Sequence, residues 1–184
     1  MERRNDTNGY ASVAKALHWL GALCIVLAWL LGTFGDDIPR DVQPGALFVH
    51  MSLGLAVIGL LVVRLGWRIG NPPPAPLETV LGAWSGQLAT ATHWLLYALM
   101  IAVPIAGITV EFARGQPLPV FGLFEIASPW VRDREFARSV REVHELLANA
   151  ILAVAALHAA AALVHHYVLK DATLLRMLPG RGHR

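Results

Sequence analysis

The feature that most constrains the fold is an uncharged stretch near the C-terminus, REVHELLANAILAVAALHAAAALVHHYVLK at residues 141–170. No formally charged residue lies between Glu145 and Lys170, and about 24 apolar residues are enough to cross a bilayer as one helix. The stretch nevertheless holds His144 and His158, which would lie about 21 Å apart along a helix and roughly 40° apart around it. Ionisable side chains inside a span usually face the bundle interior and serve a function, so these histidines are the first candidate site residues.

Three further apolar runs precede this stretch, and each has a histidine near its start: His18, His50 and His93. Polar or proline-rich connectors separate the runs. Four spans joined in this way predict an all-α integral membrane protein, an antiparallel bundle of four transmembrane helices in a single domain over residues 1–184. The predicted spans are residues 14–34, 46–67, 88–111 and 143–169.

Composition agrees with a membrane protein, because 55% of the residues are hydrophobic and only 15% are charged, against about 25% in soluble domains. The formal net charge of +2 is too small to indicate a nucleic-acid partner. Cys24 is the single cysteine, which excludes an intrachain disulfide and a C-x-x-C-H haem attachment. Any haem is therefore expected to be held non-covalently, and the first apolar run is interpreted as a retained span rather than a signal peptide.

The distribution of basic residues predicts the orientation. If both termini and the second connector lie on one side, that side holds nine Lys and Arg residues and the other side holds six. The nine are Arg3, Arg4, Lys15, Arg64, Arg68, Lys170, Arg176, Arg181 and Arg184. Because cytoplasmic segments are enriched in Lys and Arg, both termini are predicted to be cytoplasmic.

In this topology the histidines fall at two depths. His50 and His144 lie near the outer surface, whereas His18 and His158 lie toward the inner one. Two stacked pairs are what two b-type haems need, since each iron takes one imidazole from either side. Small residues that would leave room for a porphyrin lie about one turn from three of these histidines: Gly21, Gly54 and Ala162.

Other interpretations stay open at this point. Any single histidine inside a span is more often a hydrogen-bonded packing residue than a ligand. His93 competes with His18 for the inner iron, or else binds a haem propionate or lies at the interface. His165 and His166 are either solvated or neighbours of a quinone. A structural zinc fits less well, because it needs four ligands at one point.

Four segments resemble the bacterial cytochrome b561 family, and the resemblance covers nearly the whole chain: SVAKALHWL, the H-x-x-x-G at residue 50, VHELLAN, and HAAAALVHHYVLKDATLLRMLP. The resemblance implies a multi-pass protein of the bacterial inner membrane with two haems b. Matched motif by motif, it implies that His18 and His158 ligate the inner haem and that His50 and His144 ligate the outer one.

One activity within that family is superoxide oxidase, in which periplasmic superoxide gives electrons to the outer haem and ubiquinone is reduced. Superoxide is an anion, and a cationic outer loop would raise its encounter rate. The candidate steering residues are Arg114, Arg138 and Arg141, although the group Arg132, Arg134, Arg138 and Arg141 also fits a solvated amphipathic segment.

Two rival functions remain. The chain would otherwise be the cytochrome b anchor and relay subunit of a larger dehydrogenase or hydrogenase, or a small metal-handling or structural membrane protein. The partners expected from the leading interpretation are the lipid bilayer, superoxide and ubiquinone, and a protein partner is not required.

Overall fold

The computed structural model describes residues 9–75 and 82–179. Arg3, Arg4, Arg181 and Arg184, which entered the charge count, lie outside the described residues. The elements in chain order are α1 (Ser12–Phe34), the 3-10 helix η1 (Gly35–Asp37), α2 (Gln43–Gly70), α3 (Ala83–Ala113), β1 (Leu118–Val120), β2 (Phe124–Ile126) and α4 (Arg134–Tyr167).

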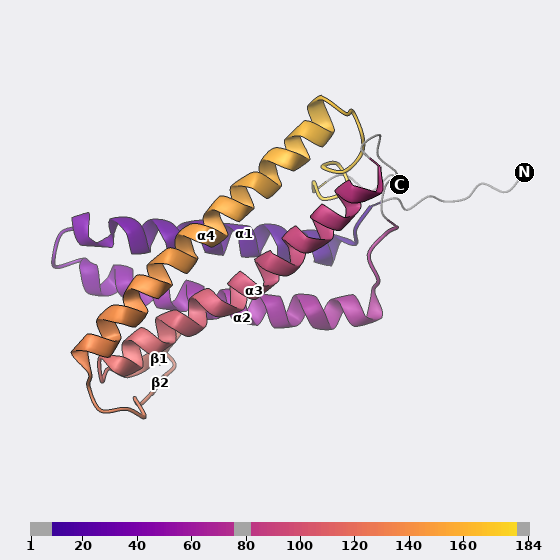
Figure 1. The fold of residues 1–184 in the computed structure, drawn as a ribbon. Coiled ribbons are helices and arrows are strands. Elements are labelled where there is room, and N and C mark those ends of the chain that lie inside the picture. The colour runs from indigo at the N-terminus through magenta and orange to yellow at the C-terminus, as the bar shows by residue number, and fades with distance from the viewer. Residues whose placement is uncertain (1–8, 76–81, 180–184) are drawn as a thin grey trace, which may run out of the picture.

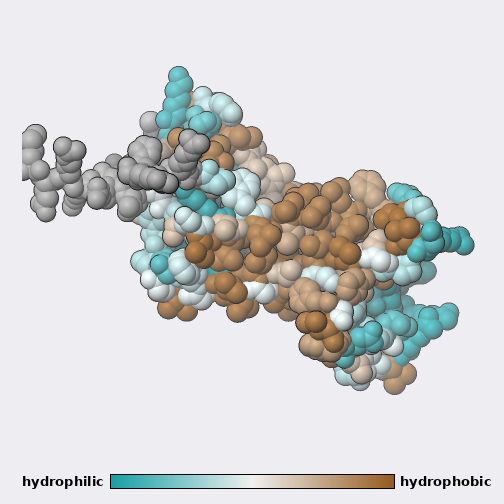
Figure 2. Space-filling model, turned by 180° about the vertical axis from the view of Figure 1, so that it is seen from behind, coloured by the Kyte–Doolittle hydropathy of each residue, from teal (hydrophilic) through white to brown (hydrophobic). Residues whose placement is uncertain are grey.

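Each of the four long helices is long and apolar enough to cross a membrane. Large apolar side chains point outward along them, as at Leu23, Val62 and Leu157. Figure 2 shows apolar residues covering the middle of the molecule and hydrophilic ones gathering at its two ends. The predicted class, an all-α membrane bundle of four helices, is confirmed, with one small two-stranded hairpin added in the last connector.

The helices form two hairpins, because α1 packs along α2 and α3 packs along α4. In Figure 1 the α3–α4 hairpin crosses the α1–α2 hairpin obliquely. The buried core lies where the hairpins meet and consists of Cys24, Val57, Leu61, Leu99, Met100 and Ile151. No Cα atom of α2 lies within 8 Å of one in α4, and both helices are described in full.

The first and last parts of the described chain meet at one end of the bundle, which we call the terminal end. The backbone N–H of Tyr10 donates to the carbonyl of Arg176 at 3.3 Å, and Trp19 Nε1–H donates to the carbonyl of Met177 at 2.8 Å. Arg176 also donates to the carbonyl of Ala75, in the connector between α2 and α3, at 2.9 Å. The opposite end carries the loop between α3 and α4 and is called the loop end.

The start of α4 differs most from its predicted position, because this helix begins at Arg134 rather than at residue 143. The Asp133 carboxylate caps it by accepting hydrogen bonds from the backbone N–H groups of Glu135 and Phe136, at 3.1 and 3.0 Å. A hydropathy pattern does not reveal a charged first turn, although an Asp at the cap position does indicate the start of a helix. As a result Arg138 and Arg141 lie on a helix and not in a loop.

Candidate functional site

At the loop end, His50 on α2 faces His144 on α4 with their ring centres 6.0 Å apart. The Nδ1–H of His50 donates to the carbonyl of Ala28 at 2.8 Å, and that of His144 donates to the carbonyl of Val103 at 2.9 Å. Because a carbonyl only accepts, both rings carry a proton on Nδ1, so Nε2 is the nitrogen that could bind a metal. A second hydrogen bond of this kind is how proteins orient a metal-binding imidazole.

Two glycines allow these rings to reach the backbone. Gly32 lies four residues after Ala28, and a Cβ atom there would stand 3.0 Å from Cε1 of His50. Gly107 lies four residues after Val103, and a Cβ atom there would stand 3.1 Å from Cε1 of His144. Any larger residue would push the ring off the carbonyl that orients it. The same device therefore holds both rings of the loop-end pair.

A cavity of about 750 Å³, lined by residues of all four long helices, surrounds His50, His144 and Gly54. Its size is in the range of sites that bind cofactors. Two metal–nitrogen bonds of about 2 Å, plus about 1.1 Å from each nitrogen to its ring centre, put the ring centres of a bis-imidazole metal roughly 6 Å apart. The measured 6.0 Å fits this arrangement. The residues at this end therefore fit a flat cofactor whose metal is held by two imidazoles.

At the terminal end, His18 on α1 faces His158 on α4 with ring centres 6.4 Å apart. His93 on α3 lies closer to His158, at 5.3 Å between ring centres. The first separation matches the bis-imidazole span, and the second is shorter than that span requires. The geometry thus favours His18 over His93 as the partner of His158.

The surroundings of His18 differ from those of the loop-end pair. Its Nδ1 lies 3.3 Å from Nη1 of Arg64. A guanidinium only donates hydrogen bonds, so Nδ1 of His18 acts here as the acceptor. Arg64 also lies over the ring of Tyr97, 5.7 Å from its centre.

Farther along α4 the two neighbouring histidines are held differently. Nδ1 of His165 donates to the carboxylate of Asp171 at 2.5 Å, and the same carboxylate accepts from the backbone N–H of Thr173 at 2.9 Å. Partial burial opposes ionisation of Asp171, but the hydrogen bonds from His165 and Thr173 outweigh it and lower the pKa of this carboxyl. His166 instead packs on the ring of Tyr167, with ring centres 4.7 Å apart.

The three candidate steering arginines gather at the loop end. Arg114 and Arg141 line the large cavity, and together with Arg138 they line a second cavity of about 240 Å³. The remaining charged residues of this second cavity are Arg132 and Arg134. The arginines on α4 are exposed, as the alternative of a solvated segment also predicted.

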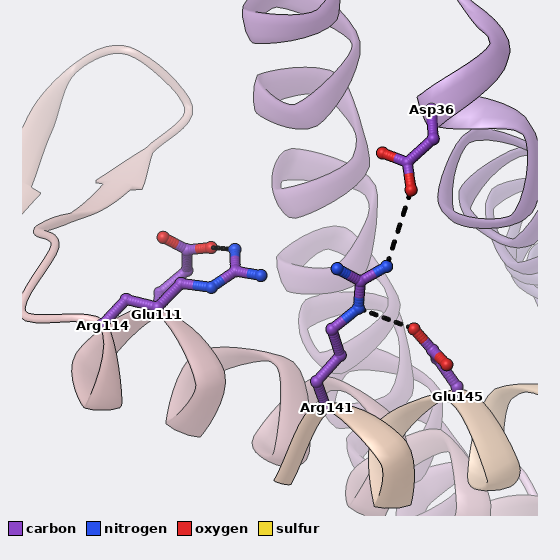
Figure 3. Close-up of polar contacts among 5 residues, drawn as sticks. All are labelled: Asp36, Glu111, Arg114, Arg141 and Glu145. Atoms are coloured by element: carbon purple, nitrogen blue, oxygen red, sulfur yellow. Dashed lines mark hydrogen bonds and ion pairs between the residues drawn. The ribbon is translucent and has the colours of Figure 1, made fainter. Parts of the chain in front are cut away.

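Figure 3 shows that two of these arginines are paired with acids. Nη1 of Arg114 lies 3.1 Å from Oε1 of Glu111, which is buried. Arg141 lies between Glu145 and Asp36, at 2.7 and 3.7 Å. In the part of the chain that the structure describes, no carboxylate lies within 4.0 Å of the other three arginines, Arg132, Arg134 and Arg138.

Sequence reasoning missed Gly32, Gly107 and Arg64 as site residues. The sequence does contain a signal for these residues. Each long helix has two site residues that are separated by fourteen positions, as His144 and His158 are. The four pairs are His18 and Gly32, His50 and Arg64, His93 and Gly107, and His144 and His158. Each helix thus contributes one residue to each end of the site.

Comparison with known proteins agrees with this architecture. The family model described as prokaryotic cytochrome b561 matches residues 9–180. A Yersinia pestis protein named "Probable superoxide oxidase CybB" is 39% identical over 176 residues, covering 92% of this chain and 96% of that protein. "Cytochrome b561 homolog 2" of Escherichia coli K12 is 31% identical over 182 residues, covering 97% and 95%. "Cytochrome b562" of Cereibacter sphaeroides is 32% identical over 179 residues, covering 94% and 97%. Four apolar helices, paired histidines and a match along almost the whole chain lead to one conclusion: this chain belongs to the prokaryotic cytochrome b561 family, membrane proteins that bind haem b and transfer electrons.

Proposed function

We propose that this protein is a di-haem oxidoreductase of the bacterial inner membrane that carries electrons from superoxide to ubiquinone. The observation that carries the proposal is the presence of two histidine pairs, one toward each end of the bundle, with ring centres 6.0 and 6.4 Å apart. Each separation suits one metal between two imidazoles.

His50 and His144 would hold the loop-end haem, and His18 and His158 would hold the terminal-end haem. When bound, such a group would supply one-electron transfer. The chain contributes ligand orientation, through the hydrogen bonds from His50 and His144 to backbone carbonyls.

The loop end is assigned to the periplasm and the terminal end to the cytoplasm, on the strength of the uneven Lys and Arg distribution. The electron donor then approaches from the side that holds the arginine cavity. Superoxide is a small anion, and a cationic surface raises its rate of encounter. The relative named as a probable superoxide oxidase supports this choice of donor.

Ubiquinone is assigned to the terminal end. Two superoxide ions give up one electron each and leave as dioxygen, and ubiquinone takes those two electrons and two protons to become ubiquinol. His165 is the candidate neighbour of the quinone, because its ring bonds to the ionised carboxylate of Asp171 at the helix end. Such a pair passes protons between the cytoplasmic surface and a bound oxygen atom.

Two measurements test the proposal. The purified protein should show about two low-spin haems b per chain in its reduced-minus-oxidised spectrum. A superoxide-generating system should then reduce a short-chain ubiquinone only when the protein is present, and the His144→Ala variant should lose this activity. Two haems without superoxide-dependent reduction would refute the donor, and a co-purifying dehydrogenase would then identify the chain as a relay subunit.

A further inference from the structure

Arg64 is the residue whose position the proposed function does not yet explain. It lies within the membrane span of α2 and is half-buried. Within the described ranges 9–75 and 82–179, no carboxylate lies within 4.0 Å of its guanidinium. An unpaired cation inside a span is costly, and such residues usually face the bundle interior and serve the site there.

The contacts of Arg64 show that it lies beside the terminal-end pair, His18 and His158. Its Nη1 lies 3.3 Å from Nδ1 of His18, and its guanidinium lies over Tyr97. One turn along α2, the indole N–H of Trp67 is buried and has no hydrogen-bond acceptor among the described residues. This stretch of α2 therefore holds an excess of donors and lacks an anionic acceptor.

The fourteen-residue interval also gives Arg64 the same position on α2 that His158 has on α4. His158 follows His144 on α4 by this interval, and Arg64 follows His50 on α2 by the same interval. The α2 helix thus presents a fixed positive charge at the level where α4 presents an imidazole ligand. At the loop end the two rings lie against Gly32 and Gly107, and the arginines that line the cavity there are paired with acids.

We propose that Arg64 is the counter-cation of the terminal-end haem, pairing with a haem carboxylate and raising the potential of that haem above that of the loop-end haem. This inference rests on the proposed function. To ligate through Nε2, a neutral His18 must carry its proton on Nδ1, the atom that accepts from Arg64 in this structure. Arg64, which only donates, then needs another acceptor, and carboxylates are the strong acceptors that haem brings.

The sign of the effect follows from charge. Ferric haem carries one positive charge more than ferrous haem, so a nearby cation disfavours the ferric state and raises the potential. At the loop end the two arginines that line the cavity, Arg114 and Arg141, are each paired with acids. The difference directs electrons from the loop end to the terminal end, toward the quinone.

The test is a spectroelectrochemical titration of the purified full-length protein, which requires neither superoxide nor quinone. The His144→Ala variant, which should keep only the terminal-end haem, identifies that haem's wave. Arg64→Gln should lower this wave by about 59 mV, the equivalent of a tenfold change for one electron, and leave the other wave in place. Arg64→Lys should keep the potential of the terminal-end haem close to its wild-type value. Arg68→Gln, one turn farther toward the surface, is the matched control and should shift this potential less than Arg64→Gln does.

The outcomes are distinguishable. Unchanged potentials in Arg64→Gln, or equal shifts of both waves, would overturn the inference while leaving the proposed function intact. Loss of the terminal-end haem in Arg64→Gln but not in Arg64→Lys would support it, because the two variants differ in charge. Loss in both variants would make Arg64 a packing residue and overturn it. A wild type without two haems would refute the proposed function itself.

Discussion

The two ends of the bundle hold histidine pairs of similar spacing in different surroundings. At the loop end, both rings lie against glycines and donate to backbone carbonyls, so close packing and main-chain hydrogen bonds together fix their orientation. At the terminal end, His18 meets a guanidinium, and a third imidazole, His93, lies beside His158. The rings of one pair contact glycines and main-chain carbonyls, whereas the rings of the other contact a guanidinium and a third imidazole. Ligand geometry and redox tuning are thus assigned to opposite ends of one molecule.

The largest expected effect comes from removing one ligand at each end. His144→Ala should lose the loop-end haem and His158→Ala the terminal-end haem, so that the haem content falls from about two to about one per chain. Superoxide-dependent quinone reduction should fall by more than about 100-fold in both, since even the outer partners of metal ligands cost 10- to 100-fold when mutated. His166→Ala serves as the control and should keep both haems. If either variant lost both haems, the two ends would not be independent sites.

Glycine substitutions test the steric fit of the loop end. Gly32→Ala and Gly107→Ala place a Cβ atom 3.0 and 3.1 Å from the ring carbons of His50 and His144. Overpacking of this kind costs about 1–3 kcal/mol, so the loop-end haem should bind more weakly, as measured by haem content after dilution or by thermal unfolding.

Gly59→Ala is the matched control, because a Cβ atom there meets nothing within 4 Å. Alanine is the better helix former by about 1 kcal/mol, so this variant should be neutral or more stable. Equal behaviour of all three variants would show that the two glycines do not position the rings.

Neutralising single arginines tests the electrostatics of the donor side. Arg138 has no carboxylate within 4.0 Å in the described part of the chain, whereas Arg114 is paired with Glu111. Arg138→Gln should therefore reduce the superoxide rate about threefold at low salt, and Arg114→Gln should reduce it less. Both rates should converge with that of the wild type as ionic strength rises. A rate and salt dependence unchanged in both variants would remove the arginine cavity from the mechanism.

The smallest expected effect concerns the polar contacts that close the terminal end. The pKa of Asp171 is lowered in the folded protein, so its contribution to stability is present above the unfolded pKa of about 3.9 and is lost as the pH falls through the folded value. Asp171→Asn should lower the unfolding temperature slightly and by a constant amount from pH 5 to 8. The difference from the wild type should shrink below about pH 4. A difference that grows in acid would contradict this assignment.

Much of the fold was predictable because membrane spans are read from hydropathy alone. Each of the four predicted spans corresponds to a long helix, but α4 extends toward the loop end to Arg134. The apolar segment of the sequence stops at the first charged residues, whereas helix α4 extends past them to its cap at Asp133. The depths of the histidines along the bundle could be predicted as well, since the rise per residue and the topology determine them.

The contacts of the site were not predictable in the same way. Whether Gly32 lies against His50 depends on how α1 and α2 pack along their whole length, and no local pattern encodes that. The contact of Arg64 with His18 likewise joins two residues 46 positions apart, on different helices. The space-making residues predicted one turn from the histidines were a partial success: Gly54 lines the cavity, but the glycines that touch the rings lie on the neighbouring helices.

Because α4 carries one histidine of each pair, the spacing of the two pairs is fixed by the number of residues between His144 and His158. Insertion of a single residue between His144 and His158 would turn one ring by about 100° and remove it from its pair. Insertion of seven would restore the face to within about 20° and lengthen the separation by roughly 10.5 Å. Electron transfer between cofactors slows steeply with distance, so neither change should be tolerated. Length variation among functional homologues should therefore be confined to the connectors and the termini, and the segment between these two histidines should keep a constant length.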